Sequence, residues 1–170
     1  MRTITLVRHA MPEVDAATDP SRWRLTTAGR AAALGRALSS RGTCSILASD
    51  EVKAAQTVAL MTGHDVADVI VDPDFGEVRR KEAVDEGFRE RRDAWIRGET
   101  DDRHHGWESF SKAGARFDAA VERHEGDLII GTHGMVLTAW LVRIGIVSPG
   151  NAASAYWRAL GLPEVITIDR

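Results

Sequence analysis

The fold is indicated most clearly by the stretch Asp127-Leu128-Ile129-Ile130-Gly131-Thr132-His133-Gly134. Its residues 127–132 predict a buried β-strand, because a short apolar run with β-branched residues is typical of a strand covered on both faces. His133 and Gly134 follow where this strand ends, and residues 135–144 predict a helix. A strand that leads directly into a helix is typical of α/β proteins.

Strands and helices alternate along the rest of the chain in the same way. We expect strands at residues 4–7, 44–48, 69–71 and 165–168, and helices at 28–38, 50–62 and 108–124. Thr26 or Thr27 would begin the first helix, and Gly42 stands where a helix stop is expected. The alternation predicts a three-layer α/β/α sandwich with a mostly parallel central sheet. No repeat or linker divides the chain, so we expect a single domain over residues 1–170.

Residues 85–105 differ from the rest of the chain in composition. Twelve of these 21 residues are Asp, Glu, Arg or Lys. A charged run of this kind favours a solvated helix over a binding patch. We therefore predict a short helical excursion at about residues 79–125, with its charged part exposed to solvent.

Composition and charge exclude several classes of protein. With 44% hydrophobic and 28% charged residues the chain is typical of a globular protein, and a net charge of -3 argues against a nucleic-acid partner. No run of about 18 apolar residues is present, so no membrane span is expected. Cys44 is the single cysteine, and no signal segment follows Met1, so we expect a cytoplasmic protein. Because adjacent His104 and His105 cannot easily share one tetrahedral ion, we predict neither a metal nor a cofactor.

Two histidines stand at the ends of predicted strands. His9 follows Leu6-Val7-Arg8, and His133 follows Ile130-Gly131-Thr132. In open α/β sheets, ligands bind beyond the carboxyl ends of the strands. A strand end that precedes a helix also offers free backbone N–H groups to an anion. The two histidines, one beside Arg8 and one beside Gly134, are therefore the candidate reactive groups.

These elements resemble the histidine phosphatase superfamily, also called phosphoglycerate-mutase-like. The family has Arg-His-Gly after its first strand, where this chain has Arg8-His9-Ala10. Its Leu-Thr-x-x-Gly helix start is matched by residues 25–29, and its late Gly-x-x-His-Gly element is close to residues 131–134. Its Arg-Ala-x-x-Thr helix is matched by residues 53–57, with Lys53 in place of the arginine. The resemblance covers roughly residues 3–157 in the family's order.

The resemblance implies a role for each matched residue. His9 would be the nucleophile that forms a phosphohistidine, and a backbone carbonyl somewhere in residues 10–29 would hold its ring in the right tautomer. His133 would donate to the phosphoryl group, Arg8 would bind two phosphate oxygens, and Gly134 would lie at the phosphate. A neutral imidazole nitrogen can attack phosphorus, and charge neutralisation supplies most of the remaining catalysis.

Lys53 departs from the family at a position with a defined task. Lysine keeps the positive charge of the usual arginine but loses the planar bidentate contact. Three interpretations compete: Lys53 is a weaker phosphate clamp, which we favour; a neighbouring arginine replaces it; or the site has lost activity and only binds an anion.

The proton donor requires a carboxylic acid within hydrogen-bond reach of the leaving oxygen. The family often places a glutamate after its third strand, and Glu77 aligns with it. The Gly-x-Trp-Glu-Gly segment that follows in the family is absent here, so Glu77 is the candidate and Glu82 the reserve. Both could equally be ordinary surface glutamates.

Together these features predict a metal-independent phosphatase that acts on a small phosphomonoester through a phosphohistidine intermediate. Mutase activity is not expected, because family mutases carry long insertions for which this chain has no room. Two alternatives remain open: a protein phosphohistidine phosphatase, and a catalytically weakened phosphate-binding or partner-binding module. The physiological substrate and the oligomeric state do not follow from the sequence.

Overall fold

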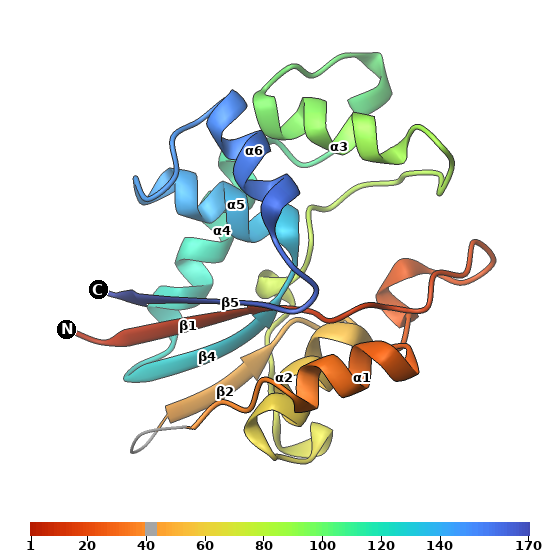
Figure 1. Ribbon diagram of the computed structural model, residues 1–170. Helices are drawn as coiled ribbons and strands as arrows, with labels where there is room; N and C mark the ends of the chain where they lie inside the picture. The colour runs from red at the N-terminus through yellow and green to blue at the C-terminus, as the bar shows by residue number, and fades with distance from the viewer. Residues whose placement is uncertain (40–43) are drawn as a thin grey trace.

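The computed structural model describes residues 1–39 and 44–170. Both ends of the chain lie beside each other at the central sheet (Figure 1). Within the described residues the strands follow the order β3-β2-β4-β1-β5. Their bounds are β1 Thr3–Arg8, β2 Cys44–Ala48, β3 Ile70–Val71, β4 Asp127–Thr132 and β5 Glu164–Asp169. The first four are parallel to one another, and β5 is antiparallel to β1. The mostly parallel sheet is therefore confirmed.

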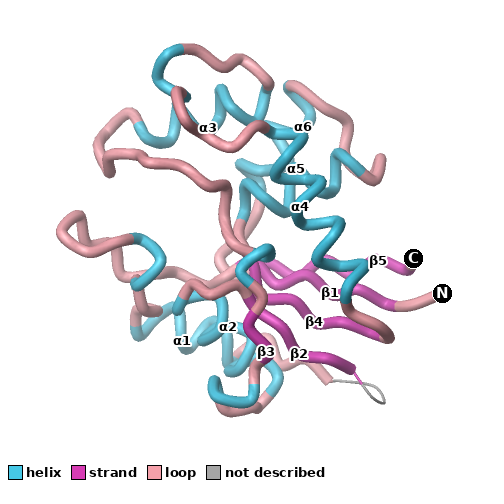
Figure 2. The backbone as a smooth tube through the Cα atoms, turned by 180° about the vertical axis from the view of Figure 1, so that it is seen from behind, coloured by secondary structure: helices cyan, strands magenta, loops and turns pink. Residues whose placement is uncertain are grey.

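Helices cover both faces of this sheet, which confirms the three layers (Figures 1 and 2). Helices α1 (Thr27–Leu34) and α2 (Val52–Thr62) lie on one face. On the other face lie α4 (Phe110–Arg123) and α5 (Gly134–Arg143), with α3 (Phe88–Arg97) and α6 (Asn151–Ala159) packed beyond them. Short 3₁₀ turns occur at Pro20–Arg22, Val66–Asp68, Pro73–Phe75 and Asp102–His104.

The core is divided by the sheet, because successive side chains of a strand point to opposite faces. Leu6 of β1 and Ile130 of β4 are fully buried in the cluster that contains α4 and α5. Val7 and Ile129, their neighbours in the sequence, belong to the cluster beneath α1 and α2. Burial on both faces explains the continuous apolar run Leu128–Ile130 of β4.

The first helix is shorter than predicted. It ends at Leu34, and Gly35 caps it by donating its N–H to the carbonyls of Ala31 and Ala33. The chain then turns toward α2, where the N–H of Leu38 donates to the carbonyl of Met61 at 2.7 Å. The predicted stop at Gly42 lies outside the described residues.

The charged excursion forms a helix as predicted, and eight of the twelve charged residues at 85–105 are exposed to solvent, but the helix also has a buried face. Four consecutive residues of α3, Asp93–Ile96, are buried, and Trp95 is only 1% exposed. Asp93 accepts a hydrogen bond from the hydroxyl of Ser154 on α6 at 2.5 Å. The composition of the segment did not indicate this buried face. Asp93 can be buried there because its charge has a hydrogen-bond partner on α6.

Helix α6 was not predicted from the sequence. It begins after Gly150, which supplies no capping side chain, so the usual start signal is missing. Its buried residues are Ala153, Ser154 and Trp157. In the described parts of the chain, no helix has both the length and the apolar character needed to cross a membrane.

Candidate active site

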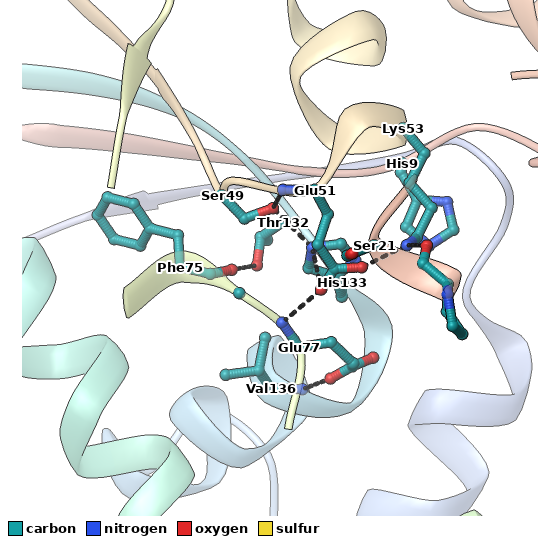
Figure 3. A network of polar contacts seen from close by, with 12 residues as sticks. His9, Ser21, Ser49, Glu51, Lys53, Phe75, Glu77, Thr132, His133 and Val136 are labelled. Carbon is teal, nitrogen blue, oxygen red and sulfur yellow. Dashed lines mark hydrogen bonds and ion pairs between the residues drawn. The ribbon is translucent and has the colours of Figure 1, made fainter. Parts of the chain in front are cut away.

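The strand register brings the two histidines to the same edge of the sheet. Arg8 pairs with Thr132 at the ends of β1 and β4, and the N–H of His9 donates to the carbonyl of Thr132 at 3.0 Å. The ring centroids of His9 and His133 lie 5.2 Å apart, and their planes are tilted by 57°. The fold thus brings together the side chains of His9 and His133, which are far apart in the sequence (Figure 3).

The ring of His9 is held by the backbone next to it. Its Nδ1 lies 2.8 Å from the carbonyl oxygen of Ala10. A carbonyl can only accept, so Nδ1 carries the proton and donates it, which leaves the lone pair on Nε2. Ala10 therefore supplies the carbonyl that the sequence could not identify. The Nε2 atom is the one that can act as a nucleophile.

The turn after His9 is anchored to α2. The N–H of Ala10 donates to the hydroxyl of Thr57 at 2.9 Å, and Thr57 donates to the carbonyl of Lys53 at 2.7 Å. Ala10 is fully buried, and among the described residues only glycines have a positive φ. Alanine can therefore stand where the family has glycine, because this turn does not need a left-handed residue.

His133 precedes α5 and is 1% exposed. Its Nε2 lies 2.8 Å from the hydroxyl oxygen of Ser49 and 3.3 Å from a carboxylate oxygen of Glu51. Its Nδ1 is buried and has no hydrogen-bond partner. Buried polar atoms normally have partners, so the hydrogen-bonding capacity of Nδ1 is unused in the free protein.

Burial keeps both imidazoles neutral in the free protein. It lowers the pKa of His9 well below its ordinary value, and the neighbouring His133 lowers it further. Burial, followed by the positive charge of Lys53, lowers the pKa of His133 to about 3. Desolvation has this effect because a cationic ring loses its hydration inside the protein. A neutral His9 at physiological pH is the form that can attack phosphorus.

Arg8 enters the site between α5 and α6. Its Nη1 donates to the carbonyl of Leu160 at 2.7 Å, while its Nε is buried without a partner. A Cβ added at Gly134 would lie 3.1 Å from this Nε and 3.1 Å from the indole nitrogen of Trp157. Glycine at position 134 therefore allows Arg8 and Trp157 to approach the start of α5. Helix α6, absent from the sequence prediction, thus forms part of the site.

Lys53 is 5% exposed and has partners within the protein. Its ammonium donates to the carbonyl of Pro20 at 2.7 Å and forms an ion pair with Glu51. The sequence analysis missed Glu51, which contacts Lys53 and His133 at once. The available signal was a carboxylate at the helix start, two residues before Lys53 of the matched helix.

Glu77 lies at the start of α5 rather than on the surface. Its carboxylate accepts hydrogen bonds from the N–H groups of Val136 and Val78, both at 2.9 Å, and of Met135 at 3.2 Å. Burial by itself raises its pKa, but the charge of Arg80 and the hydrogen bond from the N–H of Val78 outweigh this effect and lower the pKa to about 2. Glu77 is therefore ionised in the free protein.

The reserve candidate Glu82 lies among arginines of the excursion. Its carboxylate accepts from Nε of Arg80 and Nε of Arg92, both at 2.9 Å. None of its described hydrogen bonds joins it to His9 or His133.

The adjacent histidines of the excursion do not form a metal site. His104 is buried, and its Nε2 lies 2.8 Å from the carbonyl of Arg91. Among residues 1–39 and 44–170, no group of three or more His, Cys, Asp or Glu side chains could hold a metal ion.

Comparison with known families places the chain in one of them. Residues 4–161 match the model of the histidine phosphatase superfamily (branch 1). The chain belongs to this superfamily. A comparison with curated proteins found no match to this chain.

Solved structures share its fold. A mycobacterial glucosyl-3-phosphoglycerate phosphatase is 21% identical, with a TM-score of 0.64 over 94% of this chain and 84% of the other. The protein TTHB049 from Thermus thermophilus is 26% identical, with a TM-score of 0.62 over 87% and 89%. An Entamoeba histolytica phosphoserine phosphatase mutant, solved with phosphoserine, is 15% identical, with a TM-score of 0.62 over 100% and 92%.

Proposed function

We propose that this histidine phosphatase superfamily member is a metal-independent phosphatase that hydrolyses a small phosphomonoester through a phosphohistidine on His9. The observation that carries the proposal is the hydrogen bond from His9 Nδ1 to the Ala10 carbonyl, 2.8 Å long, beside the His133 ring. It directs an unprotonated Nε2 at a ligand, as nucleophilic attack on phosphorus requires.

In the first step, Nε2 of His9 forms a bond to phosphorus while the bond from phosphorus to the leaving oxygen breaks. Arg8, whose Nε is buried and unpartnered, donates to the phosphoryl oxygens as they gain charge. His133 binds the same group through Nδ1. In the second step, water attacks the phosphohistidine, and phosphate and neutral His9 are released.

Glu77 is the proposed proton donor to the leaving oxygen. The free protein holds its carboxyl group ionised. A phosphate dianion bound beside it would raise its pKa, because two like charges at short range disfavour each other. In this proposal Glu77 takes a proton when the substrate binds and transfers it to the leaving group.

The relatives support a phosphomonoester as substrate, because two of them are named as phosphatases for glucosyl-3-phosphoglycerate and phosphoserine. The mycobacterial enzyme has also been solved with inorganic phosphate. The physiological substrate of this chain depends on the segment that contains α3, which lies beside Arg8 across a cavity of about 490 Å³.

A phosphate-binding module is the second candidate, and one observation favours it. The ion pair with Glu51 engages the ammonium of Lys53, so Lys53 gives less support to charge that develops in the transition state, while Arg8 Nε and His133 Nδ1 have no partners and can still bind phosphate. In this candidate the site binds phosphate but transfers none.

Trapping the intermediate distinguishes the two candidates. The protein is mixed briefly with acetyl phosphate, quenched in alkali to preserve phosphohistidine, and measured as intact mass. We expect the gain of one phosphoryl group, its absence in His9→Ala, and release of phosphate from p-nitrophenyl phosphate by the unmodified chain only. Phosphate binding without a covalent adduct or turnover would support the binding module and contradict the phosphatase. A phosphohistidine-bearing protein, used as a parallel substrate, tests the remaining alternative.

A further inference from the structure

Glu51 contacts three residues of the site, but the proposed reaction gives it no role (Figure 3). Its side chain is 13% exposed. One carboxylate oxygen lies 3.3 Å from His133 Nε2 and accepts the N–H of Glu77 at 3.1 Å. The other oxygen is paired with the ammonium of Lys53. A largely buried carboxylate with these partners has a defined orientation.

The proton on the His133 ring can lie on either nitrogen, and Ser49 does not decide which. A hydroxyl can donate to Nε2 or accept from it, so the contact of 2.8 Å is compatible with both tautomers. An ionised carboxylate can only accept. The contact of Glu51 with Nε2 at 3.3 Å is an ion-pair contact rather than a hydrogen bond, and the negative charge of Glu51 favours the tautomer that has its proton on Nε2 and its lone pair on Nδ1.

We propose that Glu51 is a positioning residue for His133, which holds the proton on Nε2 so that Nδ1 can take up a second proton and bind the phosphoryl group. The inference rests on the proposed function for its use, but not for its geometry. Nδ1 is buried and unpartnered, as expected of an atom that waits for a ligand. The second proton comes from the monoprotonated phosphate group or from solvent, and it returns when phosphate leaves.

The surroundings of His133 explain why such help is needed. Burial and nearby cations oppose a charged ring, and the pKa of His133 is about 3 in the free protein. The ionisable groups around it are Glu51, Glu77, Lys53, Arg8, Arg80 and His9. A bound phosphate adds negative charge, and Glu51 on the opposite nitrogen stabilises the same cationic ring.

Long-range ¹H–¹⁵N spectra of the histidine rings test the proposal without any turnover. In the unmodified protein at neutral pH we expect His133 with the proton on Nε2, and both nitrogens protonated after saturation with inorganic phosphate. Glu51→Gln keeps the shape but can donate as well as accept, so we expect a mixture of tautomers and no double protonation. Ser49→Ala should retain the Nε2 proton, because Glu51 remains. Asp50→Asn, an exposed carboxylate beside Glu51, is the matched control and should leave the spectrum unchanged.

Kinetics provide a second measurement. Glu51→Gln should lower kcat for p-nitrophenyl phosphate by about tenfold or more, a loss typical of impaired proton transfer, and shift the pH profile of kcat. The proposal is overturned if the Glu51→Gln spectrum equals that of the unmodified protein, or if Ser49→Ala alone changes the tautomer. Faster turnover with tighter phosphate binding would also overturn it, since Glu51 would then be an internal anion that competes for the site. A tautomer set by Glu51 without any phosphohistidine on His9 would instead refute the proposed function and leave the positioning role intact.

Discussion

At the scale of single residues, Lys53 stands where the family has an arginine, and this difference reduces the number of hydrogen-bond donors that phosphate can contact. An ammonium group has three donors, and Lys53 directs two of them to the carbonyl of Pro20 and the carboxylate of Glu51. One donor is left for a phosphate oxygen, whereas a guanidinium offers five in a planar fork. Lys53 would therefore act as a single point contact in the proposed reaction.

Replacing Lys53 tests that contact. Lys53→Arg should raise kcat for a generic phosphomonoester with a smaller change in KM, because the added donor acts mainly in the transition state. Lys53→Ala should lower kcat/KM, with a loss that could approach about 3 kcal/mol in transition-state stabilisation. Steady-state kinetics of both variants decide the matter. An unchanged kcat/KM in Lys53→Ala would mean that another residue holds the phosphate.

At the scale of elements, the turn that carries His9 is clamped between two helices. Thr57 of α2 binds the N–H of Ala10, and Thr26 at the start of α1 donates its N–H to the carbonyl of Met11 at 3.0 Å. A Cβ on Gly29 would lie only 2.3 Å from this carbonyl oxygen. The glycine of the Leu-Thr-x-x-Gly element is therefore required by close packing of α1 on the turn.

Gly29→Ala should consequently destabilise the protein by about 2 kcal/mol or more, because backbone atoms must move to admit the methyl group. It should also reduce phosphohistidine formation, since the displaced turn carries His9. Gly35→Ala is the matched control at the end of the same helix, where the nearest atom would lie at 3.4 Å. Urea unfolding of both variants measures the difference. Equal stability of the two would show that α1 can shift without cost.

Element prediction succeeded where a local pattern was sufficient. The bounds of β2 and β4 agree with the predicted strands at 44–48 and 127–132, because a strand in the middle of the sheet is buried along most of its length and is rich in apolar residues. It failed for α6, which lacks a capping side chain, and for the buried face of α3. In both cases packing between helices far apart in the sequence supplies the stability that local signals do not show.

At the scale of the whole molecule, Glu77 links the segment after β3 to the start of α5, on the layer opposite α1 and α2. Its carboxylate satisfies N–H groups that a helix start leaves without partners. The folded protein lowers the pKa of this group from 4.5 to about 2. Folding therefore favours the ionised form.

This linkage predicts a specific pH dependence of stability. Because the pKa is depressed by folding, the contribution is fully present above about pH 4.5 and is lost as the pH falls toward 2. The shift corresponds to on the order of 3 kcal/mol. Glu77→Gln should thus lower the free energy of unfolding at neutral pH and flatten its decline in acid. Glu86→Gln, an exposed neighbour in the sequence, serves as control. Unfolding curves measured at pH 7 and at pH 3 give the free energy of unfolding of the unmodified protein and the two variants. Equal loss of this free energy between the two pH values in all three proteins would contradict the prediction.

The order of strands and helices, the layered sheet, and the positions of His9 and His133 at strand ends could all be predicted from the amino-acid sequence. These features depend on periodicity and on motifs a few residues long, which are local. Three contacts emerged only from the folded chain: Lys53 donates to the carbonyl of Pro20, Glu77 accepts from the N–H of Val136, and Trp157 packs against Gly134. The partner of a side chain depends on which distant elements meet in three dimensions, and no short stretch of sequence contains that information.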